Sequence, residues 1–160
     1  MPCSRDGGVA VVFGDLMLAP PDGTRQTLVW RKPPNAGVRG ATAKRRRDLE
    51  AIYLIGPWPT GFGGTTSLLT TRESTTGGPH SIQGRYGHPH TKPGDLMTEL
   101  ITMCPPGTIA DPFTGSGSTL VAAKALGRRA VGVEIDERYC ETAALRLSQD
   151  ALPIGQEVTA

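Results

Sequence analysis

The sequence is poor in several features that mark large classes of protein. Only 5% of its 160 residues are aromatic, and its three cysteines, Cys3, Cys104 and Cys140, lie far apart without a Cys-x-x-Cys pair. Such isolated thiols indicate neither a disulfide nor zinc, so we expect no metal. No apolar run approaches the roughly 20 residues that cross a bilayer, and the first residues lack the apolar core of a secretion signal. We therefore expect one cytoplasmic domain at most.

A glycine-rich loop, residues 111–119 (Asp-Pro-Phe-Thr-Gly-Ser-Gly-Ser-Thr), lies between a short apolar run at 108–110 and a helix-like run at 120–126. This order predicts a strand, a tight turn and a helix whose first N–H groups are free to meet a ligand. About twenty residues on, the run 129–134 reads as a second strand that ends in Glu134. A carboxylate at that distance accepts hydrogen bonds from ribose hydroxyls, which predicts an adenosine site.

Two phosphate-binding motifs are absent from this loop. Leu120 occupies the place where the dinucleotide fingerprint has Gly or Ala, and no Gly-Lys-Ser/Thr tripeptide occurs anywhere in the chain. The carboxylate of Asp111 would repel a phosphate, whereas it suits the cationic ammonium end of a methionine moiety. A nucleoside that carries an amino acid therefore fits better than a nucleotide.

The whole loop resembles the S-adenosylmethionine-binding motif of the methyltransferases that modify adenine N6 or cytosine N4 in DNA. Upstream, His90-Thr91-Lys92-Pro93 is similar to the segment that precedes this motif and helps hold the amino-acid end of the cofactor. The runs 28–32 and 47–54 resemble two paired strands late in the catalytic half of these enzymes. This order, with the catalytic half before the cofactor half, is that of the permuted subgroup called beta.

The resemblance implies an α/β fold with a Rossmann-like methyltransferase sheet and helices on both faces. It also implies S-adenosylmethionine as cofactor, duplex DNA as partner, and DNA methylation of the kind found in restriction-modification. The implied cofactor-binding residues are His90, Lys92, Asp111, Phe113, Gly115, Gly117, Ser118, Thr119 and Glu134. His80 and His88 match no motif and are interpreted as loop residues.

The catalytic motif of this family, Asp/Asn/Ser-Pro-Pro followed by an aromatic residue, is absent from the sequence. In the family its polar residue polarises the exocyclic amine and its aromatic ring stacks on a flipped base. The catalytic residues are therefore unknown, and we expect an N-terminally truncated domain, from a misplaced start codon, a split gene or a decaying copy. Two functions stay open: an enzyme, alone or completed by a second polypeptide, and a non-catalytic remnant that binds cofactor or DNA.

The missing motif has a structural consequence, because in the family its strand lies between the cofactor-loop strand and the Gly-Gly strand. The strands that end at Asp111 and Phe13 would then pair directly, leave a gap, or accept a strand from another chain. The expected organisation is one partial domain over residues 1–150, followed by a disordered tail at 151–160. Within the domain we expect late catalytic-half strands and a basic loop at 1–56, a loop or minimal target-recognition insert at 57–89, and the cofactor half at 90–150.

Strands are expected at 7–13, as a buried strand of a mostly parallel sheet, and at 27–30 and 51–55. Residues 93–104 show an apolar stripe at helical spacing, and a further helix is expected after Asp136. The buried face of that helix is expected to comprise Tyr139, Cys140, Ala143, Ala144 and Leu147.

Eight cations lie between Arg25 and Arg47 with no acid among them, although the net charge of the chain is only +2. Such a run is either a solvated loop or a phosphate-contacting surface. Beside the methyltransferase resemblance we favour DNA contact by Arg39, Lys44, Arg45, Arg46 and Arg47.

Overall fold

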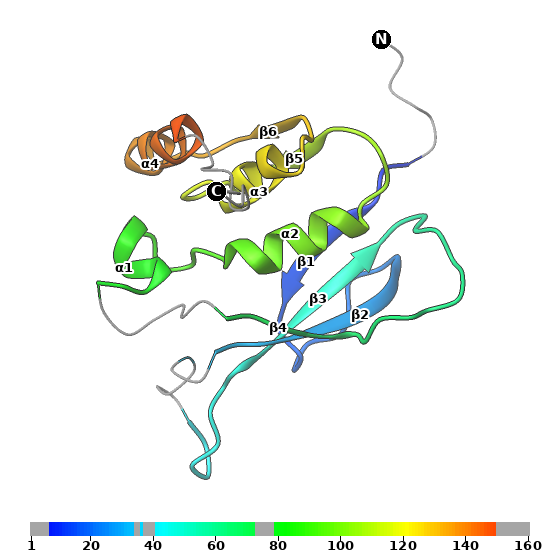
Figure 1. Cartoon of the computed structure of the whole chain (residues 1–160). Helices are drawn as coiled ribbons and strands as arrows, with labels where there is room; N and C mark the ends of the chain where they lie inside the picture. Colours follow the sequence, from blue (N-terminus) through cyan, green and yellow to red (C-terminus); the bar gives the residue numbers. More distant parts are fainter. Residues whose placement is uncertain (1–6, 34–35, 37–40, 73–78, 150–160) are drawn as a thin grey trace, which may run out of the picture.

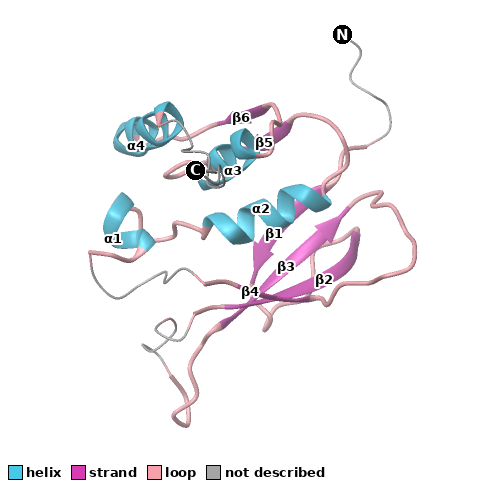
Figure 2. Cartoon of the chain, viewed as in Figure 1, coloured by secondary structure: helices cyan, strands magenta, loops and turns pink. Residues whose placement is uncertain are grey.

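The computed structural model describes residues 7–33, 36, 41–72 and 79–149 as two small sheets joined by helices (Figures 1 and 2). The elements in chain order are β1 (Ala10–Gly14), β2 (Thr24–Arg31), β3 (Leu49–Ile55), β4 (Leu68–Thr70), α1 (Ile82–Tyr86), α2 (Gly94–Met103), β5 (Ile109–Asp111), α3 (Ser118–Ala125), β6 (Ala130–Gly132) and α4 (Glu137–Ser148). Within the described ranges no helix has the length and apolar character needed to cross a bilayer.

The larger sheet has the strand order β1-β3-β2-β4. β3 is its centre and pairs antiparallel with both β1 and β2, with Val12 opposite Tyr53 and Leu28 opposite Ile52. β4 adds to the other side of β2 in parallel. Four consecutive residues of β3, 51–54, are buried because the strand is covered on both of its faces.

The smaller sheet consists of β5 and β6, which pair in parallel with Ala110 opposite Val131. α3 connects these two strands and packs against both of them, and α4 follows β6 and packs against α3. Parallel neighbours need such a helical crossover, so the two carboxyl ends lie at the same edge of the pair. The glycine loop after β5 and the acid after β6 are therefore brought together.

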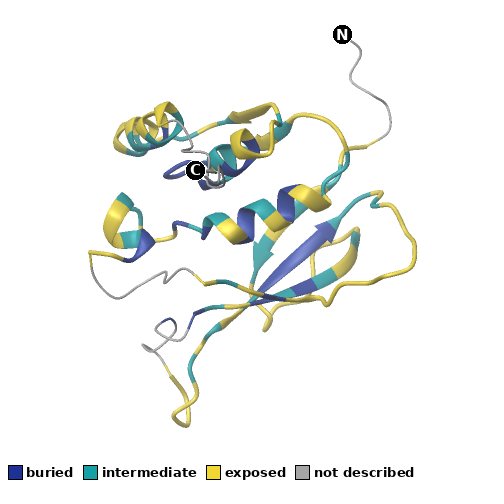
Figure 3. Ribbon diagram, viewed as in Figure 1, coloured by how far each residue is buried: buried dark blue, intermediate teal, exposed yellow. Residues whose placement is uncertain are grey.

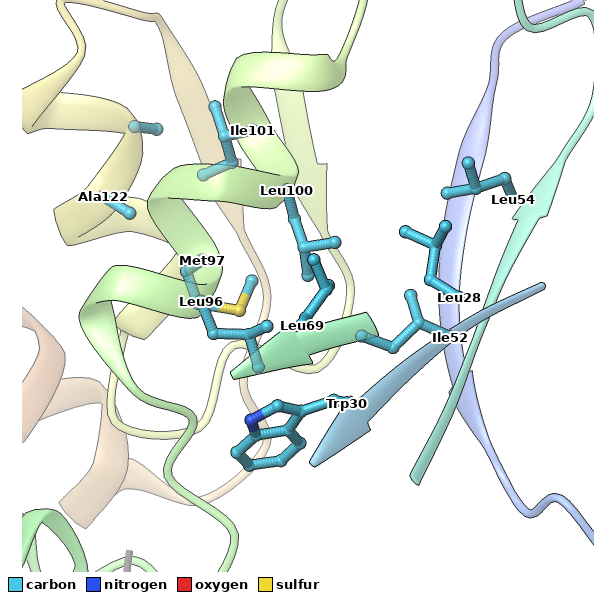
Figure 4. Close-up of a cluster of buried hydrophobic side chains, with 11 residues drawn as sticks. Leu28, Trp30, Ile52, Leu54, Leu69, Leu96, Met97, Leu100, Ile101 and Ala122 are labelled. Atoms are coloured by element: carbon cyan, nitrogen blue, oxygen red, sulfur yellow. The ribbon is translucent and has the colours of Figure 1, made fainter. Parts of the chain in front are cut away.

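Helix α2 links the two sheets through its apolar stripe (Figure 4). One side of the stripe packs on the large sheet, and the other side meets the small residues Ala122 and Ala123 of α3. The core contains Leu28, Trp30, Ile52, Leu54, Leu69, Leu96, Met97, Leu100, Ile101, Ala122 and Ala123. Burial of each Leu or Ile side chain contributes about 1.5–3 kcal/mol, so this single cluster holds both halves in place.

Most of the expected elements are present in the structure. The expected strands at 7–13, 27–30 and 51–55 correspond to β1, β2 and β3, and the expected helices correspond to α2, α3 and α4. Asp136 caps α4 by accepting the N–H of Arg138, and Gly127 follows α3 with the positive φ of a helix-ending glycine. The mixed α/β class is confirmed.

Three expectations about the elements differ from the structure. β1 is antiparallel to its neighbour and partly exposed rather than buried in a parallel sheet, because it lies at the end of the sheet (Figure 3). The insert at 57–89 contains β4 and α1, and Leu69 of β4 is in the core. On α4, Cys140 and Ala144 are exposed, since the helix contacts the loop side with Ala143. Of the three arrangements expected for β1 and β5, direct pairing is excluded, because the two strands belong to separate sheets.

Candidate functional site

At two positions the glycine loop between β5 and α3 has a backbone conformation that glycine adopts far more readily than other residues. Gly115 has φ 52° and Gly117 has φ 85°, both in the left-handed region. A Cβ on Gly117 would lie 2.8 Å from the Cβ of Ala143 in α4, so this glycine also permits the close approach of that helix. Residues 114–118 are all buried, so this part of the loop packs inside the protein and does not project from its surface.

Asp111 fixes the start of the loop with its carboxylate. One oxygen accepts the N–H of Phe113 at 2.9 Å, and the other accepts the hydroxyl of Thr119 in the first turn of α3. The Thr114 hydroxyl donates to the carbonyl of Asp111 at 3.0 Å. Phe113 projects outward with 87% of its surface exposed, which is unusual for a large aromatic side chain. Its ring is available to a ligand above the loop.

Glu134 follows β6 and closes the opposite side of the loop. One carboxylate oxygen accepts the N–H of Gly115 at 2.7 Å, and the other accepts the N–H groups of Ile135 and Asp136 at 2.8 and 2.9 Å. Hydrogen bonds from the Asp136 and Gly115 amides hold the pKa of this carboxyl below its ordinary value. Glu134 is therefore a carboxylate at neutral pH. It lies beside the glycine loop, as its distance from the loop in the sequence predicted.

Ile135 is a candidate site residue that the sequence pattern did not predict. Its side chain is fully exposed, with a relative exposure of 101%, directly after the acid that contacts the loop. A single exposed apolar side chain is common on protein surfaces, so its exposure alone does not mark a site. Its position directly after the acid that bonds the loop makes Ile135 a candidate contact for a nucleoside there.

The segment 88–92, before α2, folds against the glycine loop. The Thr91 hydroxyl lies 3.0 Å from the Ser116 hydroxyl, and the carbonyl of Lys92 accepts the Ser118 hydroxyl at 2.9 Å. These bonds place the segment beside the loop, and its expected contact with the cofactor stays a prediction. The side chain of Ser118, expected to bind cofactor, is committed to this internal contact.

His88 rather than His90 contacts the loop. A Cβ on Gly115 would lie 3.0 Å from Nε2 of His88, and the His88 ring packs edge-on against Tyr139 of α4 at 4.4 Å. Burial and the neighbouring His90 lower the pKa of His88, so it is neutral at physiological pH. His90 is exposed, and its backbone N–H donates to Nδ1 of His88. The interpretation of His88 as an unremarkable loop residue missed this contact.

The ammonium of Lys92 turns away from the loop toward the large sheet. It pairs with the carboxylate of Glu50 at the start of β3 and lies 4.0 Å from the centre of the Phe13 ring. Lys32 pairs with the same carboxylate at 2.8 Å. Burial lowers the pKa of Lys92 despite the attraction of Glu50. Burial alone would raise the pKa of Glu50, but Lys92 and Lys32 together keep it below 4.5. This cluster ties the two halves together.

The basic segment forms a small hairpin in which Thr42 and Arg45 exchange backbone hydrogen bonds. Its tip residues Ala43 and Lys44 have positive φ, as in a type I′ turn. Lys44, Arg45 and Arg47 are exposed, but Arg46 is half-buried and donates to Asp48 and to the carbonyls of Pro33 and Ala36. Arg46 therefore supports the hairpin. Arg39 lies outside the described residues.

Among the described residues no group of three or more His, Cys, Asp or Glu side chains is placed to hold a metal ion. Two open hollows in the described part of the chain lie away from the loop, one beside Gly23 and Gly56 and the other between Cys104 and Arg129.

Comparison with known proteins gives concordant matches. The N6/N4 methyltransferase family model, described as DNA methylase, matches residues 19–145. Type II methyltransferase M.ScaI of Streptomyces caespitosus is 40% identical over 79 residues, which are 48% of this chain and 26% of that protein. Type II methyltransferase M.HinfI of Haemophilus influenzae is 36% identical over 69 residues, 42% of this chain and 19% of that protein. The chain thus aligns with about a quarter or less of these relatives.

Solved structures agree at the level of the fold. The M1.HpyAVI–SAM complex superposes with a TM-score of 0.64 at 24% identity, over 91% of this chain and 76% of that one. PvuII DNA methyltransferase (cytosine-N4-specific) superposes with a TM-score of 0.60 at 18% identity, over 79% of this chain and 52% of that one. The methyltransferase-type α/β fold expected from the sequence is confirmed. Because the family model covers most of the chain, including the glycine loop and Glu134, the chain belongs to the N6/N4 DNA methylase family.

Proposed function

We propose that the glycine loop binds S-adenosylmethionine and that the chain serves the methylation of adenine N6 or cytosine N4 in DNA. The observation that carries the proposal is the hydrogen bond from Gly115 N–H to Glu134 at 2.7 Å, which joins the loop after β5 to the acid after β6. The carboxyl ends of neighbouring parallel strands are where open α/β sheets bind nucleosides. The match of this chain to the M1.HpyAVI–SAM complex supports the same cofactor.

The described side chains suit the parts of this cofactor. The Glu134 carboxylate has about four acceptor positions and uses three of them on backbone N–H groups, which leaves one for a ribose hydroxyl. Exposed Ile135 and Phe113 offer apolar contact to the adenine and to the ligand above the loop. The negative charge of Asp111 favours the cationic methionine end. His90, Lys92 and Thr119 remain proposed contributors, with Lys92 acting through the backbone that touches Ser118.

Methyl transfer needs a group that the sequence does not contain. The lone pair of an exocyclic amine is delocalised into the ring, so the transition state requires an acceptor for the N–H while the methyl group is held in line. The carboxylates of Asp111 and Glu134 are engaged in the loop, and the sequence lacks the Pro-Pro-aromatic tetrapeptide. We propose that a second polypeptide supplies this strand and its acceptor.

Two strand edges support this proposal. Among the strands that the structure describes, β1 pairs only with β3 and β5 only with β6, so each has one row of backbone N–H and C=O groups without a strand neighbour there. Val11 and Phe13 of β1 and Ile109 of β5 pack at the margin of the same core. The absence of the tetrapeptide also favours a second candidate function, a non-catalytic protein that retains cofactor and DNA binding.

Calorimetric titration with S-adenosylmethionine tests cofactor binding. The parent chain is expected to bind, and Glu134→Ala is expected to lose roughly tenfold or more in affinity because a ribose hydroxyl loses its acceptor. Glu141→Ala removes an exposed carboxylate of α4 and serves as the charge-matched control. Equal affinity of the Glu134 variant and the parent would contradict the assignment of the acid.

A methyl-transfer assay separates the two candidate functions. With tritiated S-adenosylmethionine and mixed-sequence duplex DNA, the chain alone is expected to transfer no label. Addition of a polypeptide that carries an Asp/Asn/Ser-Pro-Pro-aromatic strand is expected to restore transfer if the chain is part of an enzyme. Incorporation by the chain alone would show that the acceptor lies within these 160 residues.

A further inference from the structure

The guanidinium of Arg146, in the last turn of α4, lies against the inner side of the glycine loop. Its Nη1 donates to the backbone carbonyl of Ser116 at 2.6 Å and lies 3.3 and 3.4 Å from the hydroxyls of Ser116 and Ser118. Both serines are buried, with relative exposures of 2% and 6%. A charged donor aimed at a buried carbonyl gives a strong hydrogen bond.

The backbone carbonyl of Ser116 cannot be satisfied by regular secondary structure. Ser116 stands between two residues with positive φ, Gly115 and Gly117, and this local chain path is not part of a helix or a strand. Its carbonyl therefore has no ladder partner and needs a donor from elsewhere. Arg146 is the donor that the described residues supply.

One face of the same guanidinium lies against an aromatic ring. The centre of the Tyr86 ring, in α1, is 3.9 Å from Cζ of Arg146 in a cation–π arrangement. A planar guanidinium can stack on a ring and donate within its own plane at the same time, whereas an ammonium cannot. Arg146 thus connects three segments that are distant in sequence: α1, the glycine loop and α4.

We propose that Arg146 is a positioning residue that holds the glycine loop in its ligand-binding conformation, with Tyr86 fixing the plane of its guanidinium. This inference deepens the proposed function and rests on it for the identity of the ligand. Arg146 acts through the backbone of Ser116 and touches no reacting atom. A loop held in this way keeps its ligand-binding conformation before the ligand arrives, so no ordering cost is added at the moment of binding.

A competing explanation is that Arg146 is merely a cation at the C-terminal end of a helix, where any positive charge is favourable. Two substitutions separate the explanations. Arg146→Lys retains the charge but loses the planar fork, and Arg146→Gln loses both. Arg138→Gln, which removes a guanidinium that is 80% exposed on the same helix, is the matched control.

Hydrogen exchange without ligand tests the positioning role independently of any cofactor. In Arg146→Gln and Arg146→Lys the amides of Gly115 and Gly117 are expected to exchange about tenfold faster than in the parent, while that of Tyr53 in β3 keeps its rate. Tyr86→Leu is expected to show a smaller increase at the same amides. An equal increase at Tyr53 would indicate general destabilisation and overturn the proposal, as would unchanged loop amides or parent-like behaviour of Arg146→Lys.

Titration with S-adenosylmethionine supplies the second readout. Arg146→Gln is expected to bind about tenfold more weakly than the parent at unchanged stoichiometry, since the folded fraction is unaltered and the loop must be ordered on binding. Parent-like affinity at full stoichiometry would overturn the proposal. If the parent itself binds no S-adenosylmethionine, the proposed function fails, and the exchange experiment still decides the role of Arg146.

Discussion

Replacing Glu50 by glutamine removes a carboxylate that faces two ammonium groups, those of Lys32 and Lys92, between the large sheet and the cofactor half. The side chains of Glu50, Lys92 and Lys32 are 17%, 24% and 27% exposed, so they are largely but not fully withdrawn from water. Breaking a fully buried pair costs about 3–5 kcal/mol, and an exposed pair is worth about 0–1 kcal/mol. For this intermediate burial we expect Glu50→Gln to lower the free energy of unfolding by about 2–3 kcal/mol.

Urea unfolding followed by circular dichroism and by Trp30 fluorescence measures this loss, because Trp30 is buried beside the two lysines. Combining Glu50→Gln with Lys92→Met is expected to recover part of the stability, since the stranded charge is then removed as well. Arg138→Gln, in an exposed pair, is expected to change little. A loss below about 0.5 kcal/mol in Glu50→Gln would refute the assignment of this pair as a link between the halves.

The same pair predicts a pH dependence of stability. The pKa of Glu50 is lower in the folded chain than its ordinary value of 4.5. A carboxyl of this kind contributes stability above its unfolded pKa and loses that contribution as the pH falls through its folded pKa. The stability difference between the parent and Glu50→Gln is therefore expected to be largest above pH 4.5 and to shrink in more acidic solution. A difference that grows on acidification would contradict the argument.

Two further predictions concern the loop and the basic hairpin. Gly117→Ala is expected to lower the free energy of unfolding by about 2–4 kcal/mol, because the new Cβ sits on a left-handed residue and lies 2.8 Å from the Cβ of Ala143. Gly94→Ala, with open space around it, is the control. Equal stabilities of the two variants in thermal unfolding would refute the predicted strain at Gly117. Neutralising Lys44, Arg45 and Arg47 together is expected to flatten the slope of log K for duplex DNA against log salt by up to about three units, whereas Arg46→Gln is expected to reduce stability instead. An unchanged slope would mean that these cations are solvated and do not contact DNA phosphates.

Several features of the chain could be predicted from short stretches of sequence because their causes are local. The turn at Gly115 and Gly117 depends on the absence of a Cβ, and the position of Glu134 depends on the length of one strand–helix–strand unit. The stripe on α2 follows from helical periodicity alone. The cap at Asp136 is likewise a contact between near neighbours. Family resemblance of the loop then gave the cofactor class that geometry alone would have left open.

Other features depend on residues that are far apart in the sequence. His88 and Arg146 reach the loop from 27 and 30 positions away from Gly115 and Ser116, and no local pattern marks either residue. Lys92 is in a segment that resembles a cofactor-binding motif, yet its ammonium pairs with Glu50, 42 positions away. β4 and α1 are too short to show a periodic pattern in the sequence. β4 is held in place because the side chain of Leu69 packs in the hydrophobic core.

The sequence by itself thus determined the position and the backbone conformation of the glycine loop, since backbone freedom at glycine, strand length and helix capping act within a few residues. Only the tertiary structure decided which side chains contact that loop and which cations remain exposed, because burial and ion pairing depend on the residues that the fold brings together. Arg46 and Arg47 are adjacent in the sequence, but one is bonded to Asp48 and two carbonyls and the other faces water. A charge acquires its role from its neighbours in space, and the chain order does not specify them.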